Sequence, residues 1–219
     1  TSGSGVLTLN NALSYFSIKG NITNNGIITG TNGLTELRSA NAQSFSGSGS
    51  TQFYNLRLNN SNASGVSLSQ DVTVSNNLTF TTGMLSTGTN KLIITNTTVP
   101  TIIGYSNTKF INGNLRHHIA NNTSTYVFPI GDGMATTNYK RFDLINNSLA
   151  TTTYIDAKVA NVPQGTPAAD VDANLGASAV QWGTQLTNVL NSAVWTLTPD
   201  AQPTSGTYGV NLYVKNMAG

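Results

Sequence analysis

The stretch NITNNGIITGTNGL, residues 21–34, returns as NLTFTTGMLSTGTNKL at residues 77–92 with only small insertions. In both stretches short apolar alternations surround a glycine, Gly26 in the first and Gly83 in the second. Short alternating segments that recur with a bend residue are typical of a β-solenoid, in which each coil buries its apolar residues against its neighbours. The repeat therefore predicts that Gly26 and Gly83 occupy equivalent bends. Four residues are expected to point into the core: Ile22, Ile27, Leu78 and Leu85.

Two- or three-residue apolar alternations, such as Leu56 with Leu58, continue to about Pro100 and are separated by Asn, Gly and Ser. Each alternation is too short to be stable alone, but parallel coils would pair it above and below. Asparagines at the bends are suited to side-chain ladders between coils. The candidates are Asn24, Asn25, Asn76 and Asn77. We therefore expect a β-solenoid over residues 1–105.

The pattern changes near residue 100. Longer alternating segments follow around residues 110–115, 142–145 and 152–160, and both tryptophans, Trp182 and Trp195, lie beyond this point. Their length and spacing favour an antiparallel β-sandwich module over residues 106–219. The expected fold class is thus all-β, a parallel β-solenoid followed by an antiparallel β-sandwich. An apolar alternation that reaches Val214, close to the last residue, favours a longer parent chain.

The composition excludes several classes of partner. Charged residues make up only 8% of the chain and the formal net charge is +2, so the pI of about 8.9 rests on few ionisable groups. The ten Lys and Arg residues are scattered singly, which disfavours nucleic acid and anionic membrane surfaces. No apolar run approaches the roughly 20 residues of a membrane-spanning helix. The absence of cysteine and the Thr- and Asn-rich surface favour an extracellular bacterial protein.

Few residues are candidates for chemistry. Glu36 and Asp71 are the only acids in the first hundred residues and lie far apart in sequence, so they do not predict the paired carboxylates of a polysaccharide-cleaving enzyme. His117 and His118 are adjacent and would point to opposite faces of a strand, which argues against a shared metal ion. We expect no enzymatic activity, no metal and no cofactor. The segment Gly131, Asp132 and Gly133 reads as a turn rather than a calcium loop, because no cluster of acidic residues accompanies it.

Two binding functions compete with a purely structural one. Aromatic side chains in the second half would form a carbohydrate-stacking platform if they were exposed and coplanar, and Trp182, Tyr126 and Tyr139 are the candidate ligand-binding residues. The triplets at residues 29–31 and 87–89 both read Thr-Gly-Thr, and rows of Thr on a flat solenoid face are the arrangement of ice-binding proteins. Carbohydrate binding is the nearer alternative, and ice binding is the more distant one.

The strings SGSGSTQFYNLRLNN at residues 46–60 and GVSLSQDVTVSNNLTFTTGMLSTGTNKLIIT at residues 65–95, with FPIGDG at residues 128–133, carry a family resemblance. The first two strings resemble stalk segments of large surface proteins and adhesins that gliding bacteria export through the type IX secretion system, and the third looks like the β-rich module that often follows such a stalk. The resemblance implies a non-enzymatic stalk or presentation module at the bacterial cell surface. It also implies glycans or a neighbouring cell-surface protein as partners, with the secretion machinery as a partner during export.

Overall fold

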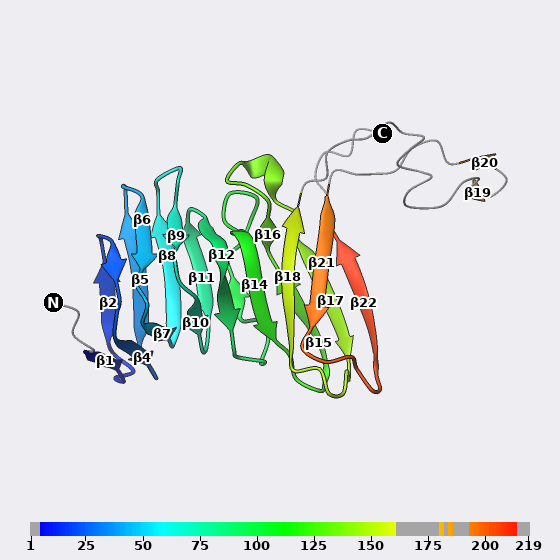
Figure 1. Ribbon diagram of the computed structural model, residues 1–219, viewed down its shortest axis with the longest axis horizontal. Helices are drawn as coiled ribbons and strands as arrows, with labels where there is room; N and C mark the ends of the chain where they lie inside the picture. Colours follow the sequence, from blue (N-terminus) through cyan, green and yellow to red (C-terminus); the bar gives the residue numbers. More distant parts are fainter. Residues whose placement is uncertain (1–4, 161–179, 182–183, 186–192, 214–219) are drawn as a thin grey trace.

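The computed structural model describes residues 5–160, 180–181, 184–185 and 193–213. Within these residues the regular secondary structure is almost entirely β-strand, and its one helical element is a short 3-10 turn, η1 (Thr136–Asn138). The described residues contain no helix that is long and apolar enough to cross a membrane. The strands wind as a parallel β-solenoid that passes into antiparallel sheets, so the fold is an elongated all-β rod, as the sequence predicts (Figure 1).

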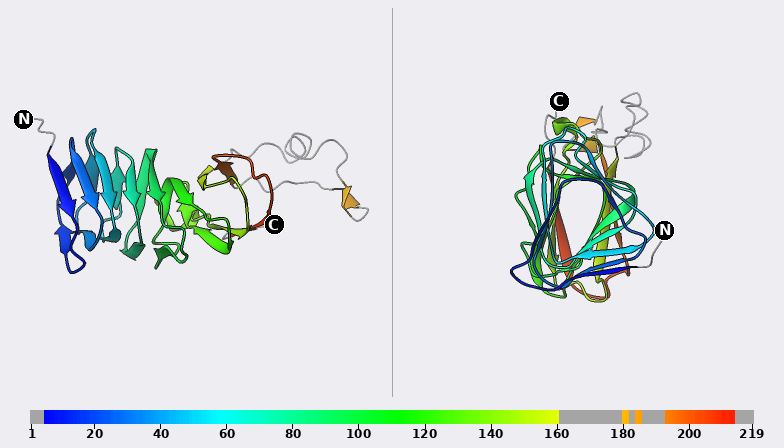
Figure 2. Two further views of the ribbon diagram at one scale, coloured as in Figure 1. Left: turned by 90° about the horizontal axis from the view of Figure 1, so that it is seen from below. Right: turned by 90° about the vertical axis from the view of Figure 1, so that its left-hand side faces the viewer.

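The solenoid has three faces and a triangular outline when it is viewed end-on (Figure 2). The first face contains β1 (Val6–Leu9), β4 (Ile27–Gly30), β7 (Ser50–Phe53), β10 (Val72–Val74) and the second halves of β12 (Leu85–Ile94) and β14 (Ile111–His118). The second face contains β2 (Tyr15–Ile18), β5 (Leu34–Ser39), β8 (Asn55–Asn60), β11 (Leu78–Thr82) and β13 (Ile102–Ile103). The third face contains β3 (Ile22–Thr23), β6 (Gln43–Ser46), β9 (Val66–Leu68), the first halves of β12 and β14, and β16 (Ile130–Gly131).

The register of the first face gives the length of a coil. Val6 pairs with Ile27 at the start of the solenoid, and further along Val72 pairs with Leu92, which in turn pairs with Leu115. Each of these pairings joins one coil to the next, so these coils take 21, 20 and 23 residues. Parallel ladders with this spacing bring one short strand per coil onto each face, where its backbone bonds to the coils before and after it.

The core is a narrow column inside the coils. Alternate residues of a strand point to opposite sides, and on β8 and β10 the inward residues Leu56, Leu58, Val72 and Val74 are buried. The buried apolar residues form one continuous cluster that extends from Leu37 in the solenoid into the antiparallel sheets. The fold therefore has one core along its length.

Asparagine side chains connect successive coils at one corner. The Nδ2 atom of Asn76 donates to Oδ1 of Asn55 at 2.9 Å, and Nδ2 of Asn96 donates to Oδ1 of Asn76 at 3.1 Å. This ladder confirms the expectation for Asn76. At another corner Asn24 donates to the Thr51 hydroxyl in the next coil at 2.9 Å. These bonds satisfy amides that the tight corners bury, which explains why Asn is frequent there.

Two antiparallel sheets continue the rod beyond the coils. β14 pairs on its far side with β18 (Tyr154–Ala160), and β18 pairs with β21 (Val194–Pro199). The opposite sheet contains β15 (Thr123–Phe128), β17 (Phe142–Asn147) and β22 (Thr207–Leu212). A separate two-stranded pair consists of β19 (Val180–Gln181) and β20 (Thr184–Gln185). Residue 105 lies between β13 and β14, and β14 belongs to both the parallel and the antiparallel parts.

The predicted equivalence of Gly26 and Gly83 is wrong. Gly26 lies at the corner between the third and first faces, whereas Gly83 lies at the corner between the second and third faces. The interval between them is longer than two coils and shorter than three, so they fall at different phases of the coil. The counterpart of Gly26 is instead Gly49, because each of these glycines precedes a first-face strand and the two strands pair.

The same phase error affects the predicted core. Leu78 and Leu85 are fully buried and Ile22 is partly buried, but Ile27 is 47% exposed. On β4 it is Ile28 that packs against the core. The two Thr-Gly-Thr triplets also lie at different corners, and Thr87 is completely buried. They therefore do not form the continuous row of exposed threonines on which the ice-binding interpretation rests.

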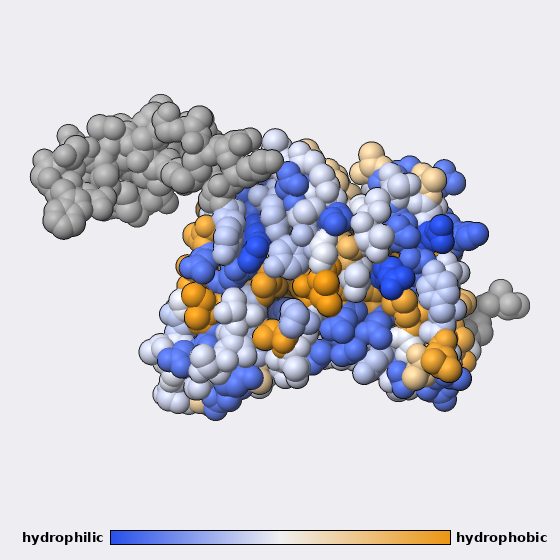
Figure 3. All heavy atoms as spheres, turned by 180° about the vertical axis from the view of Figure 1, so that it is seen from behind, coloured by the Kyte–Doolittle hydropathy of each residue, from blue (hydrophilic) through white to orange (hydrophobic). Residues whose placement is uncertain are grey.

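Apolar side chains reach the surface at the ends of the rod. On the face that Figure 3 shows, they form a band across the middle and a group at the end formed by the first coil. The exposed residues of that first coil and its neighbour include Val6, Leu7, Tyr15, Phe16 and Ile27. No coil covers the first-coil residues in the described part of the chain.

Candidate functional site

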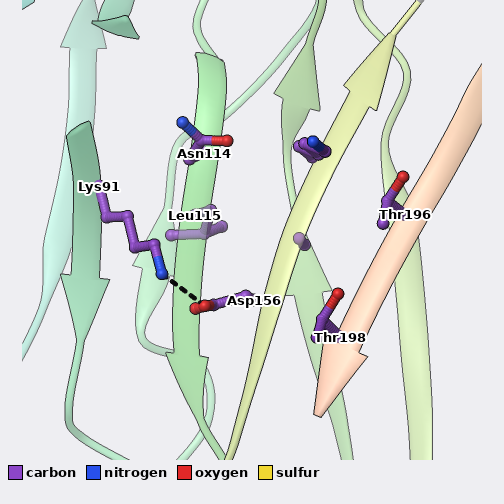
Figure 4. Close-up of a pocket in the computed structure, with 8 residues that line it drawn as sticks. Lys91, Asn114, Leu115, Asp156, Thr196 and Thr198 are labelled. Atoms are coloured by element: carbon purple, nitrogen blue, oxygen red, sulfur yellow. Dashed lines mark hydrogen bonds and ion pairs between the residues drawn. The ribbon is translucent and has the colours of Figure 1, made fainter. Parts of the chain in front are cut away.

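The best-defined hollow lies on the outer surface of the first face, where parallel strands give way to antiparallel ones. It has a volume of about 210 Å³ and spans β12, β14, β18 and β21 (Figure 4). Its polar lining residues are Lys91, Asn114, Asp156, Lys158, Thr196 and Thr198. Leu115 and Ala157 form its apolar floor. These polar side chains all point outward because they alternate with core residues along their strands.

A charge network crosses the hollow. The Asp156 carboxylate accepts two hydrogen bonds from Arg116, at 2.6 and 2.8 Å, and one from the Lys91 ammonium at 2.6 Å. Burial raises the pKa of the Asp156 carboxyl, but the hydrogen bonds from Arg116 and Lys91 outweigh burial and leave its pKa below the usual value. The Arg116 guanidinium also stacks on the Tyr154 ring, 3.8 Å from its centroid. The network is therefore a cluster of ion pairs that a cation–π contact between Arg116 and Tyr154 also stabilises.

Lys158 adds a cation that this network leaves without a counter-charge. Thr196 pairs with Lys158 in the register of β21 with β18, and Asn114 lines the same hollow. Lys158 is exposed, and no carboxylate in the described part of the chain lies within ion-pair distance of it. The Asp71 carboxylate lies at the margin of the cluster and accepts a hydrogen bond from the backbone N–H of Lys91 at 2.8 Å. Among the described residues, the hollow thus offers one ammonium group without an ion-pair partner, together with hydroxyl groups and an amide.

This arrangement is suited to binding a small ligand. Asp156 is the single carboxylate among the described residues that line the hollow, and it forms ion pairs with Lys91 and Arg116. The two acids of the first hundred residues do not supplement it as a pair, because Glu36 lies on β5 of the second face and Asp71 precedes β10 of the first. The volume is below the roughly 300–1,000 Å³ of typical drug-sized pockets. It suits one sugar ring or one small anionic group.

The structure describes two of the three predicted ligand-binding residues, Tyr126 and Tyr139. Tyr126 is completely buried, and its hydroxyl donates to the Thr97 carbonyl at 3.1 Å, so it cannot stack on an external ligand. Tyr139 is half-buried against Phe110, with ring centroids 5.4 Å apart, and burial raises the pKa of its hydroxyl. Trp182 lies outside the described residues. The predicted platform is therefore wrong for Tyr126, because that ring fills the core between the two sheets.

The segment Gly131, Asp132 and Gly133 lies at the end of β16 and in the bend that follows. A Cβ at Gly131 would fall 2.3 Å from the Phe110 ring, so this close approach requires glycine. Both oxygens of the Asp132 carboxylate are shielded from solvent and have no hydrogen-bond partner among the described residues. No group of three or more His, Cys, Asp or Glu residues with metal-binding proximity occurs among the described residues.

The two adjacent histidines differ in environment. His117 is buried and its Nδ1 lies 2.7 Å from the carbonyl oxygen of His118. Because a carbonyl only accepts, Nδ1 carries the proton, and Nε2 accepts from the Thr101 hydroxyl at 2.6 Å. Burial lowers the pKa of His117 to about 4. His117 is thus a neutral core residue, while His118 faces outward beside Tyr154.

Sequence reasoning missed the residues of the hollow. Its polar residues come from four strands, and each strand contributes only one or two of them. The available signal is in Tyr154–Ala160, where Asp156 and Lys158 occupy the outward positions of one strand. Assigning them to a shared surface requires the strand order, which the sequence pattern did not provide.

No protein-family model, no curated protein and no solved structure matches this chain.

Proposed function

We propose that this chain is a non-enzymatic stalk or presentation module of a bacterial surface protein. The observation that carries the proposal is the single path of hydrogen-bonded strands that runs from β1 to β21 without interruption. The path contains eight strands, and neighbouring strands lie about 4.8 Å apart, so it spans roughly 34 Å. A continuous core follows the same direction.

This geometry supports stiffness. In a solenoid each coil contacts its neighbours, so bending the rod disturbs both the ladder bonds and the side-chain packing between coils. The Asn55–Asn76–Asn96 ladder adds side-chain bonds in the same direction. Disulfides do not contribute, because the sequence has no cysteine. A rod of this kind separates whatever lies at its two ends.

The remaining features of the proposal rest on composition and resemblance. A low-charge surface rich in Thr and Asn suits contact with glycans or a neighbouring surface protein without strong electrostatic selectivity. Residues 46–60 and 65–95 resemble adhesin stalks, which favours an extracellular location and export by the type IX machinery.

A distance measurement tests stiffness directly. The absence of native cysteine allows two spin labels to be placed specifically, at Leu13→Cys near one end and Ser205→Cys near the other, both exposed. Double electron–electron resonance should give one narrow distance distribution that resists moderate urea. A control pair on one coil, Ser48→Cys with Ser61→Cys, calibrates the width due to the labels. A distribution much broader than that of the control would contradict a rigid spacer.

A second candidate function is the binding of an acidic sugar in the hollow around Lys158. The Lys158 ammonium, which has no ion-pair partner among the described residues, would attract a carboxylate or sulfate, while Thr196 beside it and Asn114 in the same hollow are available to sugar hydroxyl groups. Isothermal titration with galacturonate oligomers should show saturable binding that weakens with salt, whereas neutral galactose oligomers should bind at least tenfold more weakly. Lys158→Ala should abolish the difference. Lys19→Ala, which removes another exposed lysine, should leave it unchanged.

A further inference from the structure

Both ends of the rod have open strand edges. At the first end, β1 is bonded only to β4, β2 only to β5 and the two-residue β3 only to β6 among the described strands. At the other end, within the part of the chain that the structure describes, β21 is bonded only to β18 and β22 only to β17. Among the described strands, each end therefore presents two strands of four residues or more whose outer backbone edge is unpaired, one on each of two faces of the rod (Figure 1).

These edges lack the features by which proteins usually prevent edge pairing. Edge strands are commonly protected by charged side chains, bulges or proline. The sequences VLTL, YFSI and TYGVNL of β1, β2 and β22 contain no charged residue and no proline, and VWTLTP of β21 has only a terminal proline. The large apolar residues exposed on these strands are Val6, Leu7, Tyr15, Phe16, Val194, Tyr208, Val210 and Leu212. The ends thus combine free hydrogen-bonding groups with apolar surface.

The two ends also match in strand direction. β18 is antiparallel to β14 and β21 is antiparallel to β18, so β21 runs in the same direction as β14 and as β1. β22 likewise runs in the same direction as β15, because both are antiparallel to β17. β15 comes directly after β14 in the chain, just as β13 comes directly after β12, so β15 takes the place of the second-face strand in its coil. Two rods placed in line would therefore continue parallel ladders across the junction.

We propose that copies of this chain associate head to tail, with β21 of one copy pairing with β1 of the next and β22 pairing with β2. An isolated peptide strand could satisfy only one of the two edges at an end. A second copy presents two edges together, with the required direction and an apolar character at both. The contact joins two different ends, so it does not close on itself and would extend into filaments. This inference goes beyond the proposed spacer function, since a single rigid rod can act as a spacer without self-association.

Two variants that block opposite ends test the proposal. Leu7→Lys with Phe16→Lys blocks the first end, and Val194→Lys with Leu212→Lys blocks the second; all four side chains are exposed. Analytical ultracentrifugation of the unaltered chain should show a mass that increases with concentration beyond the dimer. Each blocked variant alone should be monomeric, and an equimolar mixture should form dimers and nothing larger.

The controls keep the outcomes distinct. Leu13→Lys changes an exposed residue between β1 and β2 and should leave association unchanged. Circular dichroism melts establish that each variant is folded. Monomeric behaviour of the unaltered chain at all concentrations would overturn the proposal. Dimers of a single blocked variant would also overturn it, because they would show contact between like ends. Spin-label distances within the monomer test the spacer function separately.

Discussion

Truncation of Leu78 tests the position of the core most directly. Leu78 is 0% exposed and lies in the ladder of the second face between Leu56 and Ile102. Leu78→Ala removes about three buried carbons, worth roughly 2.4 kcal/mol at about 0.8 kcal/mol each. The narrow core is bounded by backbone on three faces and can collapse only partly, so a cavity cost adds to this loss. We expect the free energy of unfolding to decrease by about 3–4 kcal/mol.

Leu13→Ala is the matched control. Leu13 is 93% exposed in the turn between β1 and β2, so the same substitution should change the free energy of unfolding by less than about 0.5 kcal/mol. Urea unfolding followed by far-ultraviolet circular dichroism gives both values. Leu78→Asp should be more destabilising than Leu78→Ala, because it buries a carboxylate without a partner. If the two alanine variants differed by less than about 1 kcal/mol, the assignment of the inward face would be refuted.

Three further predictions follow from individual residues. The pKa of His117 is about 4 in the folded chain, against an ordinary value of 6.5, so protonation at low pH favours the unfolded chain. The free energy of unfolding should be at its full value above about pH 6.5 and should fall by about 2 kcal/mol between pH 7 and pH 5. In urea unfolding, His117→Gln should flatten this pH dependence. Gly83→Ala should lower the free energy of unfolding by more than about 3 kcal/mol, because the added Cβ would lie 2.0 Å from the Asn60 carbonyl oxygen. Gly88 also has a positive φ but has open space around it, so Gly88→Ala should lower the free energy of unfolding by only about 1 kcal/mol. Asp132→Asn should raise the thermal midpoint, because it removes a solvent-shielded carboxylate without a partner; a lower midpoint would show that the charge is compensated.

The fold class was predictable because strand alternation is a local property. Pairs such as Leu56 with Leu58 reveal their buried face without knowledge of their neighbours, and the short interval between bends favours coils over long strands. The positions that are equivalent in successive coils could not be predicted from the two most similar stretches of sequence. Residues 21–34 and 77–92 resemble each other because both contain the same turn and strand residues, but equivalent residues are separated by whole coils.

Burial of polar and aromatic residues was harder to predict than burial of aliphatic ones. Thr87 belongs to a Thr-Gly-Thr string that reads as surface, yet its hydroxyl accepts the Asn114 amide at 2.7 Å and is completely buried. The sequence pattern predicts Tyr126 as an exposed ligand-stacking residue, yet its ring is buried in the core and its hydroxyl donates a hydrogen bond to a backbone carbonyl. In both cases a long-range partner removes the cost of burying the hydroxyl, and a sequence pattern does not identify that partner.

The transition from coils to antiparallel sheets explains why the hollow lies where it does. Up to β14, every strand of the first face runs in the same direction, and successive coils place similar residues in register. β18 reverses that direction and brings Asp156 beside Arg116 and within reach of Lys91 in the preceding coil. Because β18 arrives from a separate part of the chain, its outward residues need not repeat those of the coils. The junction is therefore the place on this low-charge rod where several charged side chains converge, and a ligand there would contact both the solenoid and the antiparallel sheet.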